Sequence, residues 1–219
     1  MESKAFKDGD EKIIALQIEK IISNSLMHQE YFRLCTAGGS SPKKVLEELV
    51  QREKINWSKV IIYQTDERII NNTHQDSNYY WLEKCFGKVS ALIWPFYNEK
   101  DEESSKREYE QYLKKFCNDD PCPFDLLILG FGEDGHIASL FPEEDNLCEY
   151  NETVLYTTKE YKGYKRLSLS LARLKNSKVT FLISYGLDKF KVIQDRKEND
   201  LPIFLFLKNQ ANVVWNYSI

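Results

Sequence analysis

Several kinds of protein are made improbable by what this sequence of 219 residues contains little of. Histidine occurs only at His28, His74 and His136, without His-x-x-x-His spacing, so a zinc site built by the protein is not expected. Cysteine forms an odd set without Cys-x-x-Cys spacing, which predicts reduced, mostly packed thiols rather than a disulfide framework. The five cysteines are Cys35, Cys85, Cys117, Cys122 and Cys148.

Long apolar runs and an excess of positive charge are missing as well. No apolar segment approaches the roughly 20 residues of a membrane span, and residues 1–10 are charged, without the apolar core of a secretion signal. A net charge of −4 and a pI near 5.6 are not typical of proteins that bind nucleic acid. We therefore expect a cytoplasmic protein, a monomer or weak homo-oligomer, that binds neither membranes nor nucleic acid.

The order of amphipathic and apolar segments predicts one α/β domain over residues 1–219, since no Pro-, Gly- or Ser-rich linker divides them. Helices are predicted over residues 11–28, 101–117 and 187–194, and others beginning near Ser41 and Ser77. Strands are predicted at residues 31–36, 60–64, 92–96, 126–129, 154–157, 167–171 and 179–184, and two further apolar segments, 203–207 and 213–217, follow. This alternation favours a mostly parallel sheet with helices on both faces.

Five of the nine glycines lie in two loops, each between a predicted strand and a predicted helix. In the first loop, Gly38, Gly39, Ser40 and Ser41 form a possible phosphate cradle, because glycine lets backbone N–H groups approach an anion and a helix N-terminus attracts one. Ser41 is a suitable N-cap and would be followed by a proline at the first helical position. The spacing is not that of a P-loop, and a tight turn that binds nothing is the alternative.

The second loop, with Gly130, Gly132 and Gly135, has the formal spacing of a dinucleotide-binding turn. The nicotinamide interpretation is weak, because the loop lies in mid-chain and no acidic residue follows as a ribose partner. Instead the loop carries Asp134 and His136. Histidine titrates near neutral pH and a neighbouring carboxylate can orient its ring, so His136 is the candidate general acid/base, with a structural histidine as the alternative.

Three further charged positions complete the candidate site. Asp66 and Arg68 follow a predicted strand, and side chains two residues apart on an extended backbone face the same way, so both can face one crevice. The guanidinium suits a carboxylate, a phosphate or a developing oxyanion, although a surface ion pair is the alternative. Arg166 and Lys189 are candidates for a phosphate contact, or ordinary surface charges.

Taken together, these loops resemble those of the family that contains 6-phosphogluconolactonase and glucosamine-6-phosphate deaminase. The motifs that carry the resemblance, in order, are Gly38-Gly39-Ser40-Ser41-Pro42, Asp66-Glu67-Arg68 with residues 74–79, Gly130 to Pro142, Arg166 to Leu171 and Phe181 to Lys189. The resemblance implies a Rossmann-like α/β fold that needs neither nucleotide nor metal. It also implies hydrolysis of a small phosphorylated sugar lactone, 6-phospho-D-glucono-1,5-lactone, to 6-phosphogluconate in the oxidative pentose phosphate pathway.

The resemblance also implies roles for the candidate residues. His136 would activate water, with Asp134 or Asp66 orienting the imidazole or the water. Arg68 and backbone N–H groups would stabilise the oxyanion. The phosphate would lie on the turn from Gly38 to Ser41, with Lys189 or Arg166 adding charge.

Two rival functions remain beside the lactonase. A deaminase-like isomerase would need a glutamate where this chain has Phe141, and a tyrosine where it has Arg68, so both positions count against it. A catalytically silent sugar-phosphate-binding protein could dispense with the acid/base set that this chain retains. The chain also departs from the lactonase pattern, with Ile137 in place of a common threonine and no prolines in the segment just before Arg166.

Overall fold

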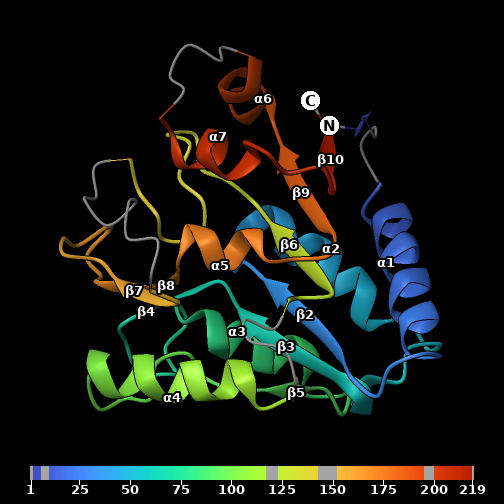
Figure 1. The fold of residues 1–219 in the computed structure, drawn as a ribbon, viewed down its shortest axis with the longest axis horizontal. Coiled ribbons are helices and arrows are strands. Elements are labelled where there is room, and N and C mark those ends of the chain that lie inside the picture. The colour runs from blue at the N-terminus through green and yellow to red at the C-terminus, as the bar shows by residue number, and fades with distance from the viewer. Residues whose placement is uncertain (1, 6–9, 117–122, 143–151, 195–199, 219) are drawn as a thin grey trace.

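A computed structural model describes residues 2–5, 10–116, 123–142, 152–194 and 200–218 of the chain. Its centre is a seven-stranded sheet whose neighbouring strands all pair in parallel (Figure 1). In spatial order the strands are β1 (Glu2–Ala5), β10 (Val213–Ser218), β9 (Thr180–Tyr185), β6 (Leu126–Leu129), β2 (Phe32–Thr36), β3 (Val60–Gln64) and β5 (Leu92–Ile93). The predicted, mostly parallel α/β sheet is thus confirmed.

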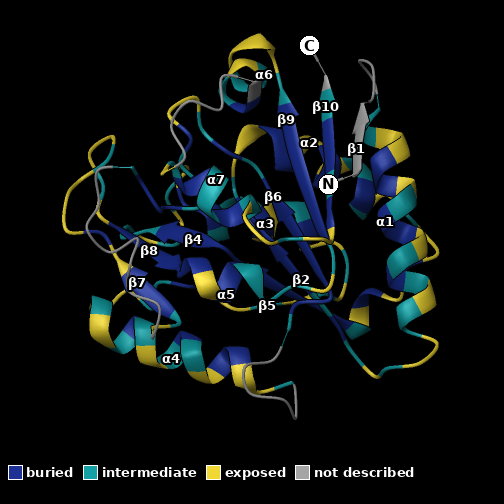
Figure 2. Ribbon diagram, turned by 45° about the horizontal axis from the view of Figure 1, so that its top comes forward, coloured by how far each residue is buried: buried dark blue, intermediate teal, exposed yellow. Residues whose placement is uncertain are grey.

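Helices cover both faces of this sheet, as the alternation of strands and helices predicts. The helices α1 (Glu11–Ser25), α2 (Ser40–Val50) and α3 (Asn78–Phe86) pack on one face, and α4 (Glu102–Lys114), α5 (Leu171–Lys175) and α7 (Pro202–Leu207) pack on the other. Neighbouring strand residues belong to opposite hydrophobic clusters: Leu34 packs with α1 and α2, and Cys35 packs with α4. The central strands are buried on both faces, while the helices expose their outer sides (Figure 2).

The remaining helical segments are short. The helix α6 (Leu187–Gln194) follows β9, and a 3-10 helix at Trp57–Lys59 precedes β3. In the described part of the chain, no helix has both the length and the apolar composition needed to cross a membrane.

A second, three-stranded antiparallel sheet, which the sequence did not predict, lies beside the large one. Its order is β4 (Asp66–Arg68), β8 (Arg166–Leu169) and β7 (Val154–Tyr156). The sequence predicts strands near β7 and β8 but only a polar stretch where β4 lies. β4 is short and polar, so its extended form depends on pairing with β8, in which Asp66 faces Ser168 and Arg68 faces Arg166.

Several predicted boundaries shift. The strand predicted to reach Leu171 ends at Leu169, because Ser170 caps α5 by accepting a hydrogen bond from the Arg173 N–H. The helix α2 begins at Ser40 with Gly39 as N-cap, so the assignment of Ser41 as N-cap is wrong. Proline is tolerated at the third helical position, because the first N–H groups of a helix have no intrahelical partner.

The chain termini also differ from expectation. The charged N-terminal segment, for which no element was predicted, contributes β1, an edge strand that pairs with β10. The apolar segment at residues 203–207 forms α7, and the segment at 213–217 forms β10. Among the cysteines, Cys35 and Cys85 are free thiols, and the other three lie outside the described residues.

The strand order reverses between β2 and β6, and this reversal positions the site. From β2 the chain adds β3 and β5 on one side, then returns to add β6, β9 and β10 on the other. In open parallel sheets a crevice opens at such a switch point, outside the carboxyl ends of the strands. Gly38 and Gly39 follow β2 after Ala37, and Gly130 directly follows β6, so both glycine loops lie at this switch point and line one cavity.

Candidate active site

A cavity of about 260 Å³ lies at the carboxyl ends of β2 and β6. Both glycine loops, the strand β4, the start of β8 and the helix α6 contribute to its walls. Nine of the ten residues singled out from the sequence line it: Gly38, Gly39, Ser40, Ser41, Asp66, Arg68, His136, Arg166 and Lys189. The tenth, Asp134, lines an outer cavity of about 450 Å³ that shares Arg68, His136, Arg166 and Lys189 with the inner one.

His136 and Asp134 form a close pair at this cavity. The imidazole Nδ1 lies 2.6 Å from the Asp134 Oδ1, and the backbone N–H of His136 donates to the same oxygen at 3.2 Å. The hydrogen bond from His136 holds the pKa of Asp134 below its ordinary value. An ionised carboxylate at Nδ1 favours the tautomer with the proton on that nitrogen, which leaves the Nε2 lone pair as the base.

Asp66 has a different set of partners. Its carboxylate is almost fully buried and accepts hydrogen bonds of 2.7 Å from the hydroxyls of Ser139 and Thr65. Ser139 follows Ala138, whose φ of 49° lies in the left-handed region, and the Ser139 N–H donates to the Ser168 hydroxyl at 3.2 Å. Asp66 therefore ties the His136 loop to the β4–β8 sheet, and of the two candidate carboxylates it is Asp134 that contacts the imidazole.

Arg68 is held by the loop that leads to α3. Its Nη1 donates to the backbone carbonyl of Asp76 and, at 3.2 Å, to the side-chain oxygen of Asn78. The side-chain amide of Asn78 donates in turn to the Asp66 carbonyl at 2.8 Å. The guanidinium thus faces the cavity with its position set from β4 and from the first residue of α3.

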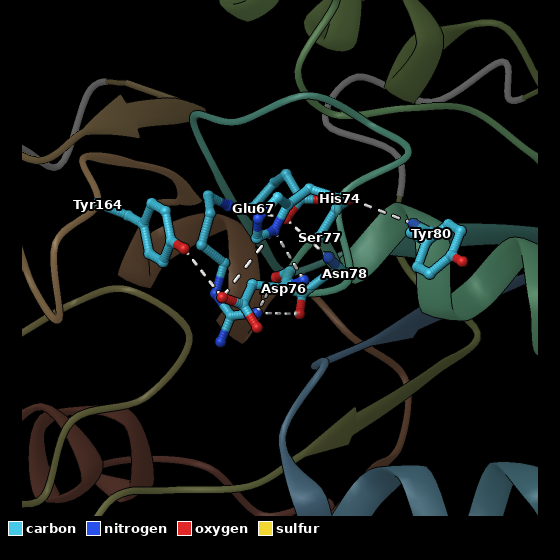
Figure 3. Close-up of polar contacts among 8 residues, drawn as sticks. Glu67, His74, Asp76, Ser77, Asn78, Tyr80 and Tyr164 are labelled. Carbon is cyan, nitrogen blue, oxygen red and sulfur yellow. Dashed lines mark hydrogen bonds and ion pairs between the residues drawn. The ribbon is translucent and has the colours of Figure 1, made fainter.

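A fully buried carboxylate, Glu67, organises this loop (Figure 3). It accepts hydrogen bonds from the Arg68, Asn78 and Tyr79 N–H groups at 2.7 to 2.8 Å, and from the Ser77 hydroxyl at 3.0 Å. Burial raises the pKa of Glu67, while the hydrogen bonds from Asn78 and Tyr79 oppose this change. Sequence reasoning missed this role, although an acidic residue between a buried strand and a polar loop was a signal for it.

Arg166 and Lys189 line the cavity from two different elements, β8 and α6. Arg166 on β8 is almost fully buried, and its Nη2 donates to the Tyr161 carbonyl at 3.2 Å. Lys189 on α6 reaches the N-terminus of α2, where its Nζ donates to the Ser41 hydroxyl at 3.3 Å. Burial lowers the pKa of both groups. Lys189 is therefore the cation that lies at the predicted phosphate cradle.

Phe141 forms an apolar wall of the outer cavity. Its ring stacks on that of Tyr161 with centroids 3.4 Å apart, and lies 4.8 Å from the His136 ring. Lys162, which the sequence did not single out as a site residue, lines both cavities. Among the described residues, no three His, Cys, Asp or Glu side chains are grouped to hold a metal ion, and the expectation that no cofactor is needed stays a prediction.

The cavity thus joins a glycine turn and cations suited to an anion with a His–Asp pair suited to proton transfer. Comparison with known proteins places the chain in a family. The family model described as glucosamine-6-phosphate isomerases/6-phosphogluconolactonase matches residues 11–215, so the chain belongs to this family. The resemblance found in the sequence motifs is thereby confirmed.

Individual relatives agree with this placement. The 6-phosphogluconolactonase of Helicobacter pylori is 32% identical over 204 residues, covering 91% of this chain and 88% of that protein. A probable 6-phosphogluconolactonase of Dictyostelium discoideum is 29% identical, covering 93% and 87%. The crystal structure of a 6-phosphogluconolactonase from Shewanella baltica superposes with a TM-score of 0.89 at 25% identity, covering 99% and 97%. The expected Rossmann-like fold is therefore confirmed.

Proposed function

We propose that this protein is a carboxylic ester hydrolase that converts 6-phospho-D-glucono-1,5-lactone to 6-phosphogluconate, in the oxidative pentose phosphate pathway. The observation that carries the proposal is the His136–Asp134 pair, 2.6 Å apart, on a cavity that the Gly38–Ser41 turn and Lys189 also line. The names of the relatives support this substrate. The proposal agrees with the function expected from the sequence.

In the proposed reaction, Nε2 of His136 accepts a proton from water as the water attacks the lactone carbonyl. Asp134 accepts the Nδ1 hydrogen bond, keeps the ring oriented and stabilises the imidazolium that forms. The same imidazolium then returns the proton to the ring oxygen as that oxygen leaves. One residue thus serves both proton transfers, and the overall reaction consumes one water molecule.

The negative charge that develops on the carbonyl oxygen requires donors within reach. Arg68 faces the cavity, and its position is set by Asp76 and Asn78. A well-aimed donor at an oxyanion contributes roughly 3 kcal/mol to transition-state stabilisation. We assign this role to Arg68 together with backbone N–H groups of the glycine loops.

The phosphate would be bound at the opposite end of the cavity. The N-terminus of α2 begins at Ser40, directly after the two glycines, and presents N–H groups without intrahelical partners. Lys189 already contacts the Ser41 hydroxyl, and Arg166 adds a buried charge on the other wall. This separation fixes the lactone between an anion cradle and a general base.

The two rival functions fit the geometry less well. An isomerase of the deaminase type would need a carboxylate at Phe141, but that ring is stacked on Tyr161 and cannot transfer a proton. A protein that only binds the sugar phosphate would not require the hydrogen-bonded His136–Asp134 pair, because binding involves no proton transfer. Location in the cytoplasm, a monomeric or weakly homo-oligomeric state and the absence of nucleic-acid or membrane partners stay predictions of the sequence.

The deciding experiment is a coupled assay that generates the lactone in situ and measures 6-phosphogluconate formation above the spontaneous rate. We expect a clear acceleration by the protein. No acceleration would contradict the proposal. Isothermal titration with 6-phosphogluconate separates the remaining cases, because binding without turnover would support the silent binding protein.

A further inference from the structure

A tight hairpin at the edge of the site carries a lysine that the proposed reaction does not use. Lys162 and Gly163 have φ angles of 52° and 79°, both in the left-handed region. Tyr161 and Tyr164 exchange backbone hydrogen bonds of 2.9 and 3.3 Å on either side of them. This is the arrangement of a two-residue hairpin turn, in which both central residues have positive φ. Residues 161–164 thus form a tight turn, the 161–164 hairpin.

The residue type at the tip of this hairpin is unusual. Glycine, asparagine and aspartate occupy such positions with little steric strain, whereas lysine does so less readily. Non-glycine residues in this conformation are retained where surrounding contacts hold them, and they cluster at functional sites. Lys162 lines both the inner and the outer cavity. Its side chain is exposed.

Contacts at both stems of the hairpin hold its tip over the site. The Tyr161 ring stacks on Phe141, with the ring planes 6° apart, and the Tyr161 carbonyl accepts the hydrogen bond from Arg166. On the other stem, the Tyr164 hydroxyl donates to the Asp76 carboxylate at 2.9 Å (Figure 3). Asp76 is also the residue whose carbonyl accepts from Arg68. The hairpin is therefore tied to the walls of the site on both sides.

We propose that Lys162 is a substrate-binding residue that contacts the phosphate together with Lys189, and that Tyr164 is a positioning residue that acts through the hairpin. Lys162 and Lys189 line the same two cavities, and the inner one contains the Gly38–Ser41 turn. The chemistry recognised is that of a phosphate dianion. This inference rests on the proposed function, since it needs a phosphorylated substrate in the cavity.

The substitution Lys162→Asn tests the charge without disturbing the turn, because asparagine tolerates the left-handed conformation. We expect the KM for the phosphorylated lactone to rise about fivefold, with kcat changed less than about twofold, because the contact is made equally before and in the transition state. Lys162→Arg should restore the KM. The rise should shrink at high salt, because an exposed charge is screened.

Lys165→Asn is the matched control. Lys165 is exposed and directly follows the hairpin, but it lines neither cavity. Its substitution removes the same charge from the same region of the surface. We therefore expect an unchanged KM. Equal KM values for Lys162→Asn and Lys165→Asn would overturn the role of Lys162.

Tyr164→Phe tests the positioning role, because it removes only the hydroxyl that reaches Asp76. We expect a smaller rise in KM than Lys162→Asn produces. If Tyr164 acts through Lys162, the double variant should have the same KM as Lys162→Asn alone. If the double variant instead has a KM raised by the product of the two single factors, the positioning role of Tyr164 is overturned and the role of Lys162 is kept.

Failure of the inference and failure of the proposed function are distinguishable. A wild-type protein that accelerates lactone hydrolysis, with the same KM in the Lys162→Asn variant, refutes the inference alone. A wild-type protein without turnover refutes the function. In that case titration calorimetry with 6-phosphogluconate decides on Lys162: a fivefold weaker affinity of the Lys162→Asn variant supports the phosphate contact, and an unchanged affinity refutes it.

Discussion

Gly132 lies so close to His136 that no side chain fits between them. A Cβ atom added to Gly132 would lie 2.2 Å from the Nδ1 of His136 and 2.4 Å from the Oδ1 of Asp134. Both distances are well below a van der Waals contact, and both atoms belong to the hydrogen-bonded pair. The absence of a side chain at residue 132 is thus a condition for the candidate acid/base pair.

Gly132→Ala should therefore displace the pair. We expect kcat to fall about 100-fold, because a displacement of about 1 Å at a reacting group has an effect of that size. KM should change less than kcat, because the atoms nearest to the added Cβ belong to His136 and Asp134. Gly39→Ala gives the contrasting case: its Cβ meets nothing closer than 3.8 Å, so any effect there should be on KM. Steady-state kinetics should show an effect on kcat in Gly132→Ala and an effect, if any, on KM in Gly39→Ala. A normal kcat for Gly132→Ala would contradict the prediction.

His136→Ala removes the proposed base. General acid–base catalysis contributes about 10²- to 10⁴-fold, so we expect kcat to fall by at least that range while the fold stays intact. The side chain is one-third exposed, so its removal leaves little empty space. Circular dichroism and thermal unfolding provide the control for folding. A variant with near-normal turnover would remove His136 from the mechanism.

Asp134→Asn should lower kcat about 100-fold or more, since an amide favours the wrong imidazole tautomer, while KM stays close to normal. A pH dependence of stability follows as well. The pKa of Asp134 is lowered in the folded protein from its ordinary value of 3.8, so the ionised carboxylate stabilises the fold above that pH. This stabilisation is lost as pH falls through the folded value.

The pH prediction is checked by denaturant unfolding of the wild type and of Asp134→Asn between about pH 2 and pH 7. The free energy of unfolding of the wild type should decrease relative to that of the variant below about pH 4. A difference that stays constant across this range would show that the His136–Asp134 hydrogen bond does not stabilise the folded state.

Glu67→Ala should destabilise the fold by about 3–5 kcal/mol, because it leaves several buried N–H and hydroxyl donors without an acceptor. Arg68 would also lose the loop that positions it, so activity should fall at temperatures where the variant is still folded. Glu83→Ala on α3 is the matched control, since Glu83 is exposed. This substitution should lower the free energy of unfolding by no more than about 0.5 kcal/mol. Chemical unfolding of both variants measures the difference, and equal costs would contradict the organising role of Glu67.

Lys189→Ala should raise the KM for the phosphorylated lactone about tenfold with kcat nearly unchanged, because it removes a charged phosphate contact. Lys191→Ala on the same helix is the control: Lys191 is exposed and pairs with Asp188, and it lines neither cavity. Its KM should match the wild type. An unchanged KM for Lys189→Ala would instead assign the phosphate to Lys162, to Arg166 or to the backbone of the turn.

Much of the architecture could be predicted because it depends on local pattern. Runs such as Val60–Gln64 and Leu126–Leu129 are too apolar for any position except a sheet buried on both faces. Glycines close after β2 and β6, at Gly38, Gly39, Gly130 and Gly132, place turns at the carboxyl edge. The residues of the site are therefore visible in the sequence as strand-terminal loops, and the family motifs assign chemistry to them.

The partners within the site could not be predicted in the same way. Asp66 and Asp134 are equally acidic neighbours of a loop, yet Asp66 accepts from Ser139 and only Asp134 meets the imidazole. β4 has no apolar pattern and becomes a strand only by pairing with β8. Lys162 lines the cavity because its hairpin is held by Phe141 and Asp76, which are distant from it in the chain.

By itself, the sequence determined the order of most strands and helices, the two glycine loops and the family, because hydrophobic periodicity and loop motifs are properties of neighbouring residues. Only the tertiary structure decided which carboxylate contacts His136, which cation reaches Ser41 and which buried glutamate holds Arg68. Lys189 meets Ser41 across 148 residues of chain, and Asp66 is held by Ser139 across 73, so the packing of two sheets and their helices sets these distances.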